Sequence, residues 1–306
     1  MTAAERSSVG SRVDGILNIN KPAGLTSHDV VARVRRLTGQ RKAGHAGTLD
    51  PMATGVLLVC LGQATRVAEY LMRGQKTYRA TIRFGVTTDT YDAEGTVTQE
   101  TPSFELSEQQ IERALDSLRD IGMQIPPPYS AVRLGGLRLY ALARRGIAVE
   151  AAPRPVKIET LELVAWQPPF ATLEIRCSPG TYVRSLAHDL GQSLGVGGHL
   201  TVLTRLGSGR WHLDGAITLE QLQAAVEAGD WSDLLHPLDA ALEDLPRLDL
   251  PHELIARLAV GQSVQIAEAP DTPLARAYAP DGVLWALVKP SPQQPGWWQP
   301  RKVFAR

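Results

Sequence analysis

The sequence predicts an α+β protein with one large domain and a small β-rich domain at its C-terminus. Apolar runs of strand length are numerous, but they do not alternate regularly with helical patterns, so a βαβ arrangement is not expected. The 306 residues suffice for one large and one small domain, and no apolar run is long enough to span a membrane. An acidic, proline-punctuated segment at 216–250 separates the two parts. We therefore expect the large domain at 15–245 and the small one at 246–306.

The N-terminal part of the chain begins with a polar segment. Residues 1–14 contain no apolar stretch of the kind found in a secretory signal, so we interpret them as a flexible leader. A first strand is predicted at 15–19, and a buried strand at 56–61. Between them, Thr26 precedes apolar residues at helical spacing, which predicts a capped amphipathic helix. Its apolar face consists of Val30, Val31, Val34 and Leu37.

The middle of the chain combines strand patterns with a second capped helix. Ser107 and Gln110 have the spacing of a capping box, so a helix should begin there and end near Leu118. Alternating or continuous apolar runs predict three strands, at 78–84, 156–165 and 171–177.

Three further segments complete the predicted elements. Thr181 can cap a helix that carries three leucines on one face, and a strand is expected at 200–213. Thr218 begins a short helix in the acidic segment. The C-terminal domain shows two short strand patterns, at 264–266 and 283–288.

The most informative part of the chain is the motif Gly44-His45-Ala46-Gly47-Thr48-Leu49-Asp50-Pro51. Its single carboxylate, Asp50, precedes a proline, and residues in that position are disfavoured in the α region. Asp50 is therefore expected in an extended or turn conformation with its carboxylate projecting from the backbone. An Asp-Pro pair taken alone more often caps a turn than performs chemistry.

This motif, continued by Ala53 and Gly55-Val56-Leu57, resembles the catalytic aspartate motif of the TruB-type tRNA pseudouridine synthases, GHxGTLDPxAxGVL. Four further motifs of the family follow the expected order and spacing over about residues 15–215. They are Lys21-Pro22, Lys76-Thr77-Tyr78, Gly180-Thr181-Tyr182-Val183-Arg184, and Gly198-His199-Leu200 with Leu203 and Arg205.

The resemblance implies both a fold and an activity. The fold would be a catalytic domain with a mixed, largely antiparallel sheet, followed by a PUA-like RNA-binding domain at 246–306. The activity would be isomerisation of one uridine in the TΨC loop of tRNA, at tRNA position 55, to pseudouridine. No metal and no organic cofactor is expected. The expected partner is the T-stem-loop of tRNA, without a membrane or a guide RNA, and the enzyme is expected to be a cytoplasmic monomer.

The resemblance assigns the chemistry to Asp50. Pseudouridine formation breaks the C1′–N1 bond, turns the uracil and joins C5 to C1′. Uracil can leave as a delocalised anion, so one carboxylate can suffice where a glycosidase uses two. Asp50 would attack C1′ or remove the proton from C2′, and we favour the second. Arg184 would keep Asp50 ionised and aimed, since a nearby cation stabilises a carboxylate. An isolated arginine at this position would otherwise lie on a helix surface.

Four other residues receive roles from the resemblance. Tyr78 would stack on the flipped uracil and handle a proton at C5, and Leu203 would pack on the opposite face of the base. His45 would occupy the space that the flipped nucleotide vacates. Lys21 would support the catalytic turn or contact RNA. Without the motifs, Tyr78 and Leu203 would be interpreted as core residues and His45 as a structural group.

A basic insertion is predicted at about 121–150. Its arginines are interleaved with Tyr129 and Tyr140, a composition that can grip phosphates and stack on unpaired bases. The insertion resembles the mobile RNA-gripping insertion of bacterial family members; a solvated surface loop is the alternative. The arginines expected to contact RNA are Arg138, Arg144 and Arg145.

Charge and cysteine usage agree with an RNA partner in a reducing compartment. The formal net charge is zero, but residues 1–80 hold 12 Lys and Arg against 5 Asp and Glu, and residues 216–250 hold 1 against 8. We expect the acidic segment to face away from any phosphate backbone. Cys60 and Cys177 lie in apolar runs without ligand spacing, which favours buried thiols over a disulfide or a metal site.

Three other functions compete with this interpretation. A dyskerin-type relative shares the aspartate motif but works within a guide-RNA particle; the insertion and the lack of long basic tails favour a stand-alone enzyme. An RNA-binding chaperone could help tRNA to fold without isomerising it. A nucleoside hydrolase is disfavoured because the sequence has no Asp-rich calcium-binding signature.

Overall fold

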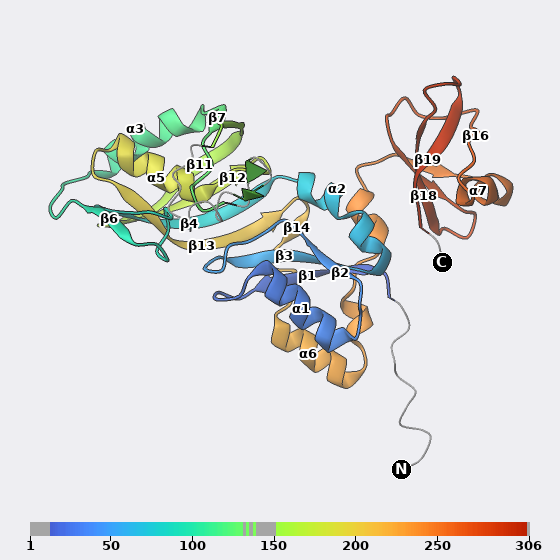
Figure 1. Cartoon of the computed structure of the whole chain (residues 1–306), viewed down its shortest axis with the longest axis horizontal. Helices are drawn as coiled ribbons and strands as arrows, with labels where there is room; N and C mark the ends of the chain where they lie inside the picture. Colours follow the sequence, from blue (N-terminus) through green and yellow to red (C-terminus); the bar gives the residue numbers. More distant parts are fainter. Residues whose placement is uncertain (1–12, 131–132, 135–136, 139–150, 305–306) are drawn as a thin grey trace, which may run out of the picture.

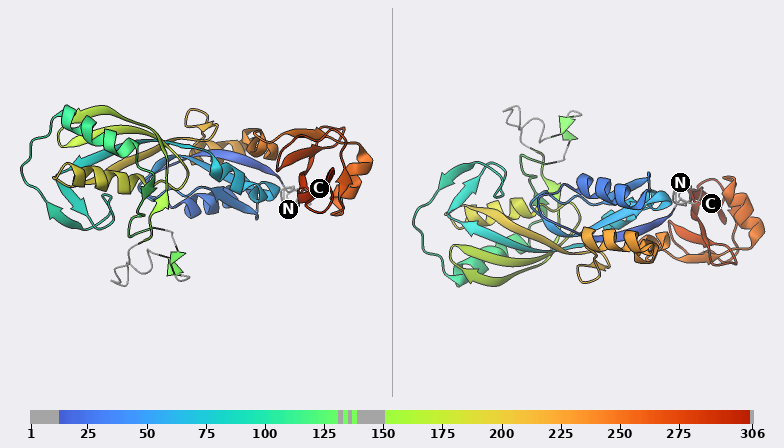
Figure 2. Two further views of the ribbon diagram at one scale, coloured as in Figure 1. Left: turned by 90° about the horizontal axis from the view of Figure 1, so that it is seen from above. Right: turned by 90° about the horizontal axis from the view of Figure 1, so that it is seen from below.

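The structure is a computed structural model that describes residues 13–130, 133–134, 137–138 and 151–304. Figure 1 shows an elongated molecule in which a large α+β domain is followed, at one end, by a β-rich C-terminal domain. The two views in Figure 2 show the same end-to-end arrangement. The expected fold class is confirmed.

Within the described ranges, none of the helices has both the length and the apolar character needed to cross a membrane.

An eight-stranded sheet forms the large domain. Its strands are β1 (Gly15–Lys21), β2 (Ala43–Ala46), β3 (Thr54–Leu61), β4 (Lys76–Phe84), β11 (Ile158–Gln167), β12 (Phe170–Cys177), β13 (Gly198–Ser208) and β14 (Trp211–His212). The order is β1-β3-β13-β4-β12-β11, with β2 paired to β3 and β14 to β13. All neighbours are antiparallel except β3 and β13, which run parallel where Gly55 faces Arg205. The sheet is thus mixed and largely antiparallel, as expected.

Helices cover the sheet and bury its apolar faces. They are α1 (Ser27–Thr38), α2 (Ala68–Arg73), α3 (Glu108–Arg119), α5 (Val183–Ser193), α6 (Leu219–Ala228) and the 3₁₀ helices η2 (Gly62–Arg66), η3 (Trp231–Leu234) and η4 (Leu238–Leu242). One core joins apolar residues of α1, α3, α5 and α6 to the sheet, and a second core joins α2 and η4 to the other side of β1 and β3. Successive residues of β1 point to opposite faces, so Ile16 belongs to the second core and Leu17 to the first.

Three of the four predicted helix caps are confirmed. Thr26, Ser107 and Thr218 each accept a hydrogen bond from the backbone three residues later, and each forms a full capping box. The prediction for Thr181 was wrong by one residue, because α5 has Tyr182 at its N-cap. The Thr181 hydroxyl instead donates to the Ser178 carbonyl at 3.0 Å and closes the preceding turn.

The predicted strand at 200–213 is interrupted. Strand β13 ends at Ser208, and Gly209, with φ of +60°, reverses the chain into the short strand β14. A continuous apolar pattern does not distinguish a long strand from a tight hairpin whose two arms are both buried. The other predicted strands of the large domain match within a few residues.

Three short strand pairs lie outside the main sheet. They are β5 (Val86–Thr88) with β6 (Val97–Glu100), β7 (Met123–Gln124) with β10 (Arg154–Pro155), and β8 (Arg133–Leu134) with β9 (Leu137–Arg138). Of the residues predicted to grip RNA in the insertion, Arg138 lies at the end of β9. Arg144 and Arg145 lie outside the described residues, as does Tyr140.

The C-terminal domain has its own sheet and core. Its elements are β15 (Arg247–Asp249), α7 (His252–Ala259), β16 (Val264–Gln265), β17 (Ala275–Tyr278), β18 (Leu284–Pro290) and β19 (Trp297–Val303), with strand order β15-β17-β18-β19-β16. Leu287 and Phe304 extend into the second core of the large domain, and Lys302 pairs with Glu69 of α2 at 2.6 Å. The likeness of this domain to a PUA domain and the exact boundary near 246 stay predictions.

The predicted leader is only partly described, since residues 1–12 lie outside the described ranges. Its last two residues contact the large domain. The Val13 backbone donates to the Gln40 side chain at 3.1 Å, and Asp14 accepts from the Gln63 backbone at 2.6 Å. Residues 13 and 14 therefore belong structurally to the large domain rather than to a separate leader.

The basic and acidic segments meet within the large domain. Helix α6 of the acidic segment packs beside the arginine-bearing helix α1 (Figure 1). How the acidic segment faces a bound phosphate backbone stays a prediction.

The cysteines are core thiols, as expected. Cys60 and Cys177 are fully buried and free. Burial raises the pKa of the Cys60 thiol to about 12 and that of Cys177 to about 11, so both are uncharged at neutral pH.

The parallel contact between β3 and β13 depends on a glycine. Gly55 has φ of +100°, and a Cβ atom at this position would lie 2.2 Å from the Arg205 carbonyl oxygen. We expect Gly55→Ala to lower the free energy of unfolding by at least about 2 kcal/mol, since strain and clash with backbone add together. Urea titration followed by circular dichroism measures this. Gly44→Ala is the matched control, because a Cβ there meets nothing within 4 Å; equal stability of the two variants would contradict the prediction.

Candidate active site

Asp50 lies in the turn between β2 and β3, as the Asp-Pro pair predicts. The Ala53 backbone donates to the Asp50 carbonyl at 3.1 Å, which closes the turn. Gly47, with φ of +97°, takes a left-handed conformation just before it. The Asp50 side chain stays 37% exposed, so its carboxylate is accessible from outside.

Three side chains hold the backbone around Asp50 from different elements. From β13, Arg205 donates to the Val56, Thr48 and Gly47 carbonyls at 2.6, 3.3 and 3.1 Å. From α1, the Ser27 hydroxyl donates to the Leu49 carbonyl at 3.0 Å and accepts from the Leu49 backbone at 2.8 Å. The third is Lys21. Because each contact is to backbone rather than to the carboxylate, the turn is fixed while Asp50 keeps its oxygen atoms free for other partners.

Lys21 is fully buried at the end of β1. Its ammonium group donates to the Pro22, Leu25 and Pro51 carbonyls at 2.9, 2.6 and 3.1 Å. Burial lowers the pKa of Lys21 to about 8, and the nearby Asp50 charge partly opposes this shift. No part of the side chain reaches the surface, so of its two expected roles the support of the Asp50 turn is favoured over an RNA contact, and both stay predictions. In this geometry Lys21 joins the end of β1 to the Pro51 carbonyl of the Asp50 turn.

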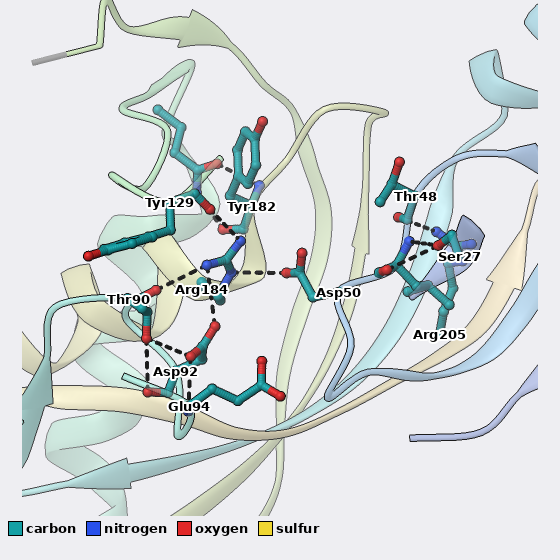
Figure 3. A network of polar contacts seen from close by, with 12 residues as sticks. Ser27, Thr48, Asp50, Thr90, Asp92, Glu94, Tyr129, Tyr182, Arg184 and Arg205 are labelled. Atoms are coloured by element: carbon teal, nitrogen blue, oxygen red, sulfur yellow. Dashed lines mark hydrogen bonds and ion pairs between the residues drawn. The ribbon is translucent and has the colours of Figure 1, made fainter. Parts of the chain in front are cut away.

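Arg184 joins the Asp50 turn to the rest of the site, as Figure 3 shows. It lies in the first turn of α5 and is only 6% exposed, so the alternative of a helix-surface arginine is wrong. The expected ion pair with Asp50 is present, with Nε 3.0 Å from Oδ2. Its two terminal nitrogens contact three further acceptors: the Asp92 carboxylate at 3.3 Å, the Thr90 carbonyl at 3.1 Å and the Tyr129 carbonyl at 3.0 Å.

Asp92 is a site residue that the sequence analysis missed. Its carboxylate is 4% exposed, and one oxygen faces Arg184. The other oxygen accepts from the Thr90 hydroxyl at 2.6 Å and from the Glu94 backbone at 3.1 Å. Burial and the charges of Asp92 and Asp50 raise the pKa of the neighbouring Glu94 carboxyl. The available signal was the run of polar residues at 89–95 directly after a strand.

The first residues of the predicted insertion are part of the site. The side-chain amide of Gln124 donates to the Tyr182 carbonyl at 3.1 Å and accepts from the Tyr182 backbone at 2.8 Å. The Ser185 hydroxyl donates to the Ile125 carbonyl at 2.9 Å. With the contact of Arg184 to Tyr129, these bonds fasten residues 124–129 to the start of α5, so this part of the insertion is not a solvated loop.

A cavity of about 600 Å³ opens beside Asp50 and Arg184. Tyr78 on β4 and Leu203 on β13 line it, and they are 8% and 6% exposed. In the antiparallel register Tyr78 faces Arg205, so Leu203 is its diagonal neighbour on the same face. Burial raises the pKa of the Tyr78 hydroxyl, while the adjacent Arg205 acts in the opposite direction. Both residues are core residues whose accessible edges face the cavity.

His45 stands apart from this cavity. It lies on β2, and its ring packs edge-on against His28 with centroids 5.2 Å apart. Burial lowers its pKa, and its buried Nδ1 has no hydrogen-bond partner among the described residues. Its expected role beside a flipped nucleotide stays a prediction.

Within residues 13–304, apart from the gaps in the described ranges, no three His, Cys, Asp or Glu side chains cluster closely enough to hold a metal ion.

Two solved structures of multi-component complexes share this architecture. A chain in the crystal structure of a Cbf5-Nop10-Gar1 complex aligns with a TM-score of 0.68 and 27% identity, covering 90% of this chain and 78% of that one. A chain in the structure of an H/ACA RNP bound to a substrate RNA containing 2′-deoxyuridine aligns with a TM-score of 0.70 and 26% identity, covering 95% and 85%. The fold is thus one that also occurs in a ribonucleoprotein bound to a substrate RNA.

Sequence comparison identifies the family. Residues 35–183 match the profile described as TruB family pseudouridylate synthase (N terminal domain), and residues 184–243 match that of the tRNA pseudouridylate synthase B C-terminal domain. The tRNA pseudouridine synthase B of Dehalococcoides mccartyi strain BAV1 is 43% identical over 96% of this chain and 97% of its own. That of Symbiobacterium thermophilum is 48% identical over 85% and 86%. The chain belongs to the TruB family of pseudouridylate synthases.

The burial of Lys21 has a measurable pH dependence. Its pKa is about 8 in the folded protein against an ordinary value of 10.5, so between these values the unfolded chain binds more protons and stability rises with pH. We expect the difference in unfolding free energy between wild type and Lys21→Met to grow by about 2 kcal/mol from pH 8 to pH 10. Urea titrations at both pH values measure it. Lys157→Met, which removes a 73% exposed lysine, should show no such growth; a pH-independent difference for Lys21 would contradict the assignment.

Proposed function

We propose that this protein isomerises the uridine at position 55 in the TΨC loop of tRNA to pseudouridine. The observation that carries the proposal is the single carboxylate of Asp50, held by Arg184 at the edge of the 600 Å³ cavity and embedded in the complete aspartate motif of the family. Relatives named tRNA pseudouridine synthase B cover almost the whole chain, which supports tRNA as the substrate.

The cavity can receive one flipped base. Tyr78 and Leu203 occupy diagonal positions on neighbouring strands, which are about 7–8 Å apart in an antiparallel pair. Atoms in van der Waals contact lie about 3.5–4.0 Å apart. A flat ring between two side chains needs this distance on each of its faces, so the two side chains must be about 7–8 Å apart. Stacking on an aromatic ring contributes about 1–3 kcal/mol per base, which offsets much of the cost of flipping. We therefore assign Tyr78 and Leu203 to the two faces of the uracil.

Asp50 begins the reaction in this proposal. It removes the proton from C2′ as the C1′–N1 bond breaks, or it attacks C1′ directly; we favour proton removal. The uracil leaves as an anion, turns within the cavity and forms the C1′–C5 bond. As this bond forms, Asp50 returns its proton to C2′ or, in the other route, the bond between Asp50 and C1′ breaks. The proton lost from C5 is balanced by the proton that N1 gains, so the overall change is an isomerisation that requires no redox partner. The Tyr78 hydroxyl would relay the C5 proton; it is protonated at neutral pH, and burial raises its pKa further.

Arg184 orients the Asp50 carboxylate. Its contacts to Asp92 and to two carbonyls leave the guanidinium no rotational freedom, so the Nε–H bond to Asp50 has a fixed direction. The insertion arginines, His45 and the C-terminal domain are proposed to bind the RNA around the flipped nucleotide.

The proposal is tested most directly with Asp50→Asn. The substitution keeps the size of the side chain but removes the charge, so neither proton abstraction nor attack at C1′ remains available. We expect no pseudouridine from a T-stem-loop transcript incubated with the protein alone, while filter binding of the same RNA stays within about threefold of wild type.

Wild type and Asp116→Asn, which changes a 67% exposed carboxylate on α3, should both convert the RNA without any guide. A folded Asp50→Asn protein that forms pseudouridine at the wild-type rate would contradict the proposed mechanism. A wild-type protein that needs added guide RNA would favour the guide-dependent alternative, and RNA binding without any conversion would favour the chaperone.

Arg184→Lys separates charge from geometry. Lysine keeps the positive charge but lacks the planar fork that reaches several acceptors at once. We expect the single-turnover rate to fall about 100-fold with RNA affinity little changed, because misplacing a reacting group costs about this much. Quenched-flow measurement of pseudouridine provides the rate, with Arg79→Lys on the exposed side of the sheet as control. A near-wild-type rate for Arg184→Lys would remove this residue from the proposed mechanism.

A further inference from the structure

Tyr91 has an unusual backbone conformation beside the active site. Its φ is +63°, and among the described residues it is the one non-glycine residue with a positive φ. Bulky side chains rarely adopt this left-handed conformation, which is strained and persists only where surrounding contacts impose it.

The two neighbours of Tyr91 are both acceptors for Arg184. The Thr90 carbonyl accepts from Nη1 at 3.1 Å, and the Asp92 carboxylate lies 3.3 Å from the same nitrogen. Rotation about the backbone of Tyr91 would move these two groups apart. The orientation of Arg184, and through it that of Asp50, therefore depends on the conformation of this single residue.

The side chain of Tyr91 is held by a ring on α5. It stacks on His188 with ring centroids 3.8 Å apart and an interplanar angle of 9°. His188 lies one helical turn after Arg184, so both side chains project from the same face of the helix. One helix thus supplies both the guanidinium and the ring that holds the loop against it.

His188 contributes its flat ring rather than a charge or a hydrogen bond at Nδ1. Burial lowers its pKa, so the imidazole is neutral at neutral pH. Its Nδ1 atom is buried without a hydrogen-bond partner in the described part of the chain. Another flat ring at this position should therefore stack on Tyr91 in the same way.

We propose that the Tyr91–His188 stack is a positioning device that keeps residues 90–92 in register with Arg184. The proposal rests on the proposed function only for its effect on rate; its effect on the loop can be measured in the protein alone. His188 does not line the cavity and touches no reacting atom.

The test compares His188→Ala, which removes the ring, with His188→Phe, which keeps a flat ring without nitrogen atoms. We expect His188→Ala to lower the single-turnover rate of pseudouridine formation about tenfold, with RNA affinity unchanged, because a small misplacement of Arg184 affects chemistry more than binding. His188→Phe should recover most of the rate. His252→Ala, at an exposed position in the C-terminal domain, should match wild type.

Hydrogen exchange of the free protein provides the second measurement. The Glu94 N–H, bonded to the Asp92 carboxylate, and the Leu200 N–H, bonded to the Tyr91 carbonyl, should exchange faster in His188→Ala and regain protection in His188→Phe. Unchanged exchange and rate in His188→Ala would overturn the proposal, as would a Phe variant that behaves like Ala. If wild type converts no uridine, the proposed function fails, while the exchange data still decide the role of the stack.

Discussion

The guanidinium of Arg184 joins four segments that are distant in the sequence. Arg184 is carried by α5 and is more than nine-tenths buried. Its guanidinium bonds to the Asp50 turn, to the loop at 90–92 and to Tyr129. A buried cation is stable only when its donors find acceptors, so the fold must bring all of these groups to one place. Of its two carboxylate partners, Asp50 is the more exposed, with 37% against 4% for Asp92, so the Asp50 carboxylate stays open to the cavity while Asp92 helps to fix the arginine.

Asp50 is positioned by two kinds of interaction, one with the backbone of its turn and one with its carboxylate. Lys21, Arg205 and Ser27 bind backbone groups in and beside the Asp50 turn and leave its carboxylate alone, whereas Arg184 binds the carboxylate itself. The turn is fixed by groups that do not compete for the Asp50 oxygens. Burying the three cations Lys21, Arg205 and Arg184 around this turn is costly, and the lowered pKa of Lys21 reflects that cost. The turn can therefore be held firmly while the Asp50 carboxylate stays accessible.

Much of the site could be predicted because short sequence motifs contain its residues. The Asp50 turn follows from the Asp-Pro pair, and the helix caps at Thr26 and Ser107 follow from hydroxyl and amide spacing. The Arg184 pair came from the resemblance alone. Asp92 was missed because a polar loop has no periodicity, and its partner lies 92 residues further along the chain. The burial of Lys21 depends on three carbonyls that only the folded turn brings together.

The parallel contact between β3 and β13 also bears on how the protein is made. Arg205, which holds Gly47 and Thr48, bonds to Val56 across 149 positions of the chain. At translation rates of about 5–20 residues per second, the ribosome reaches this arginine roughly 7–30 s after it has passed the Asp50 motif. During that interval the Gly55 end of β3 has no β13 partner and is an open strand edge. A nascent chain at this stage carries an unpaired strand edge, and its Asp50 turn has the Ser27 and Lys21 bonds but not yet those of Arg205.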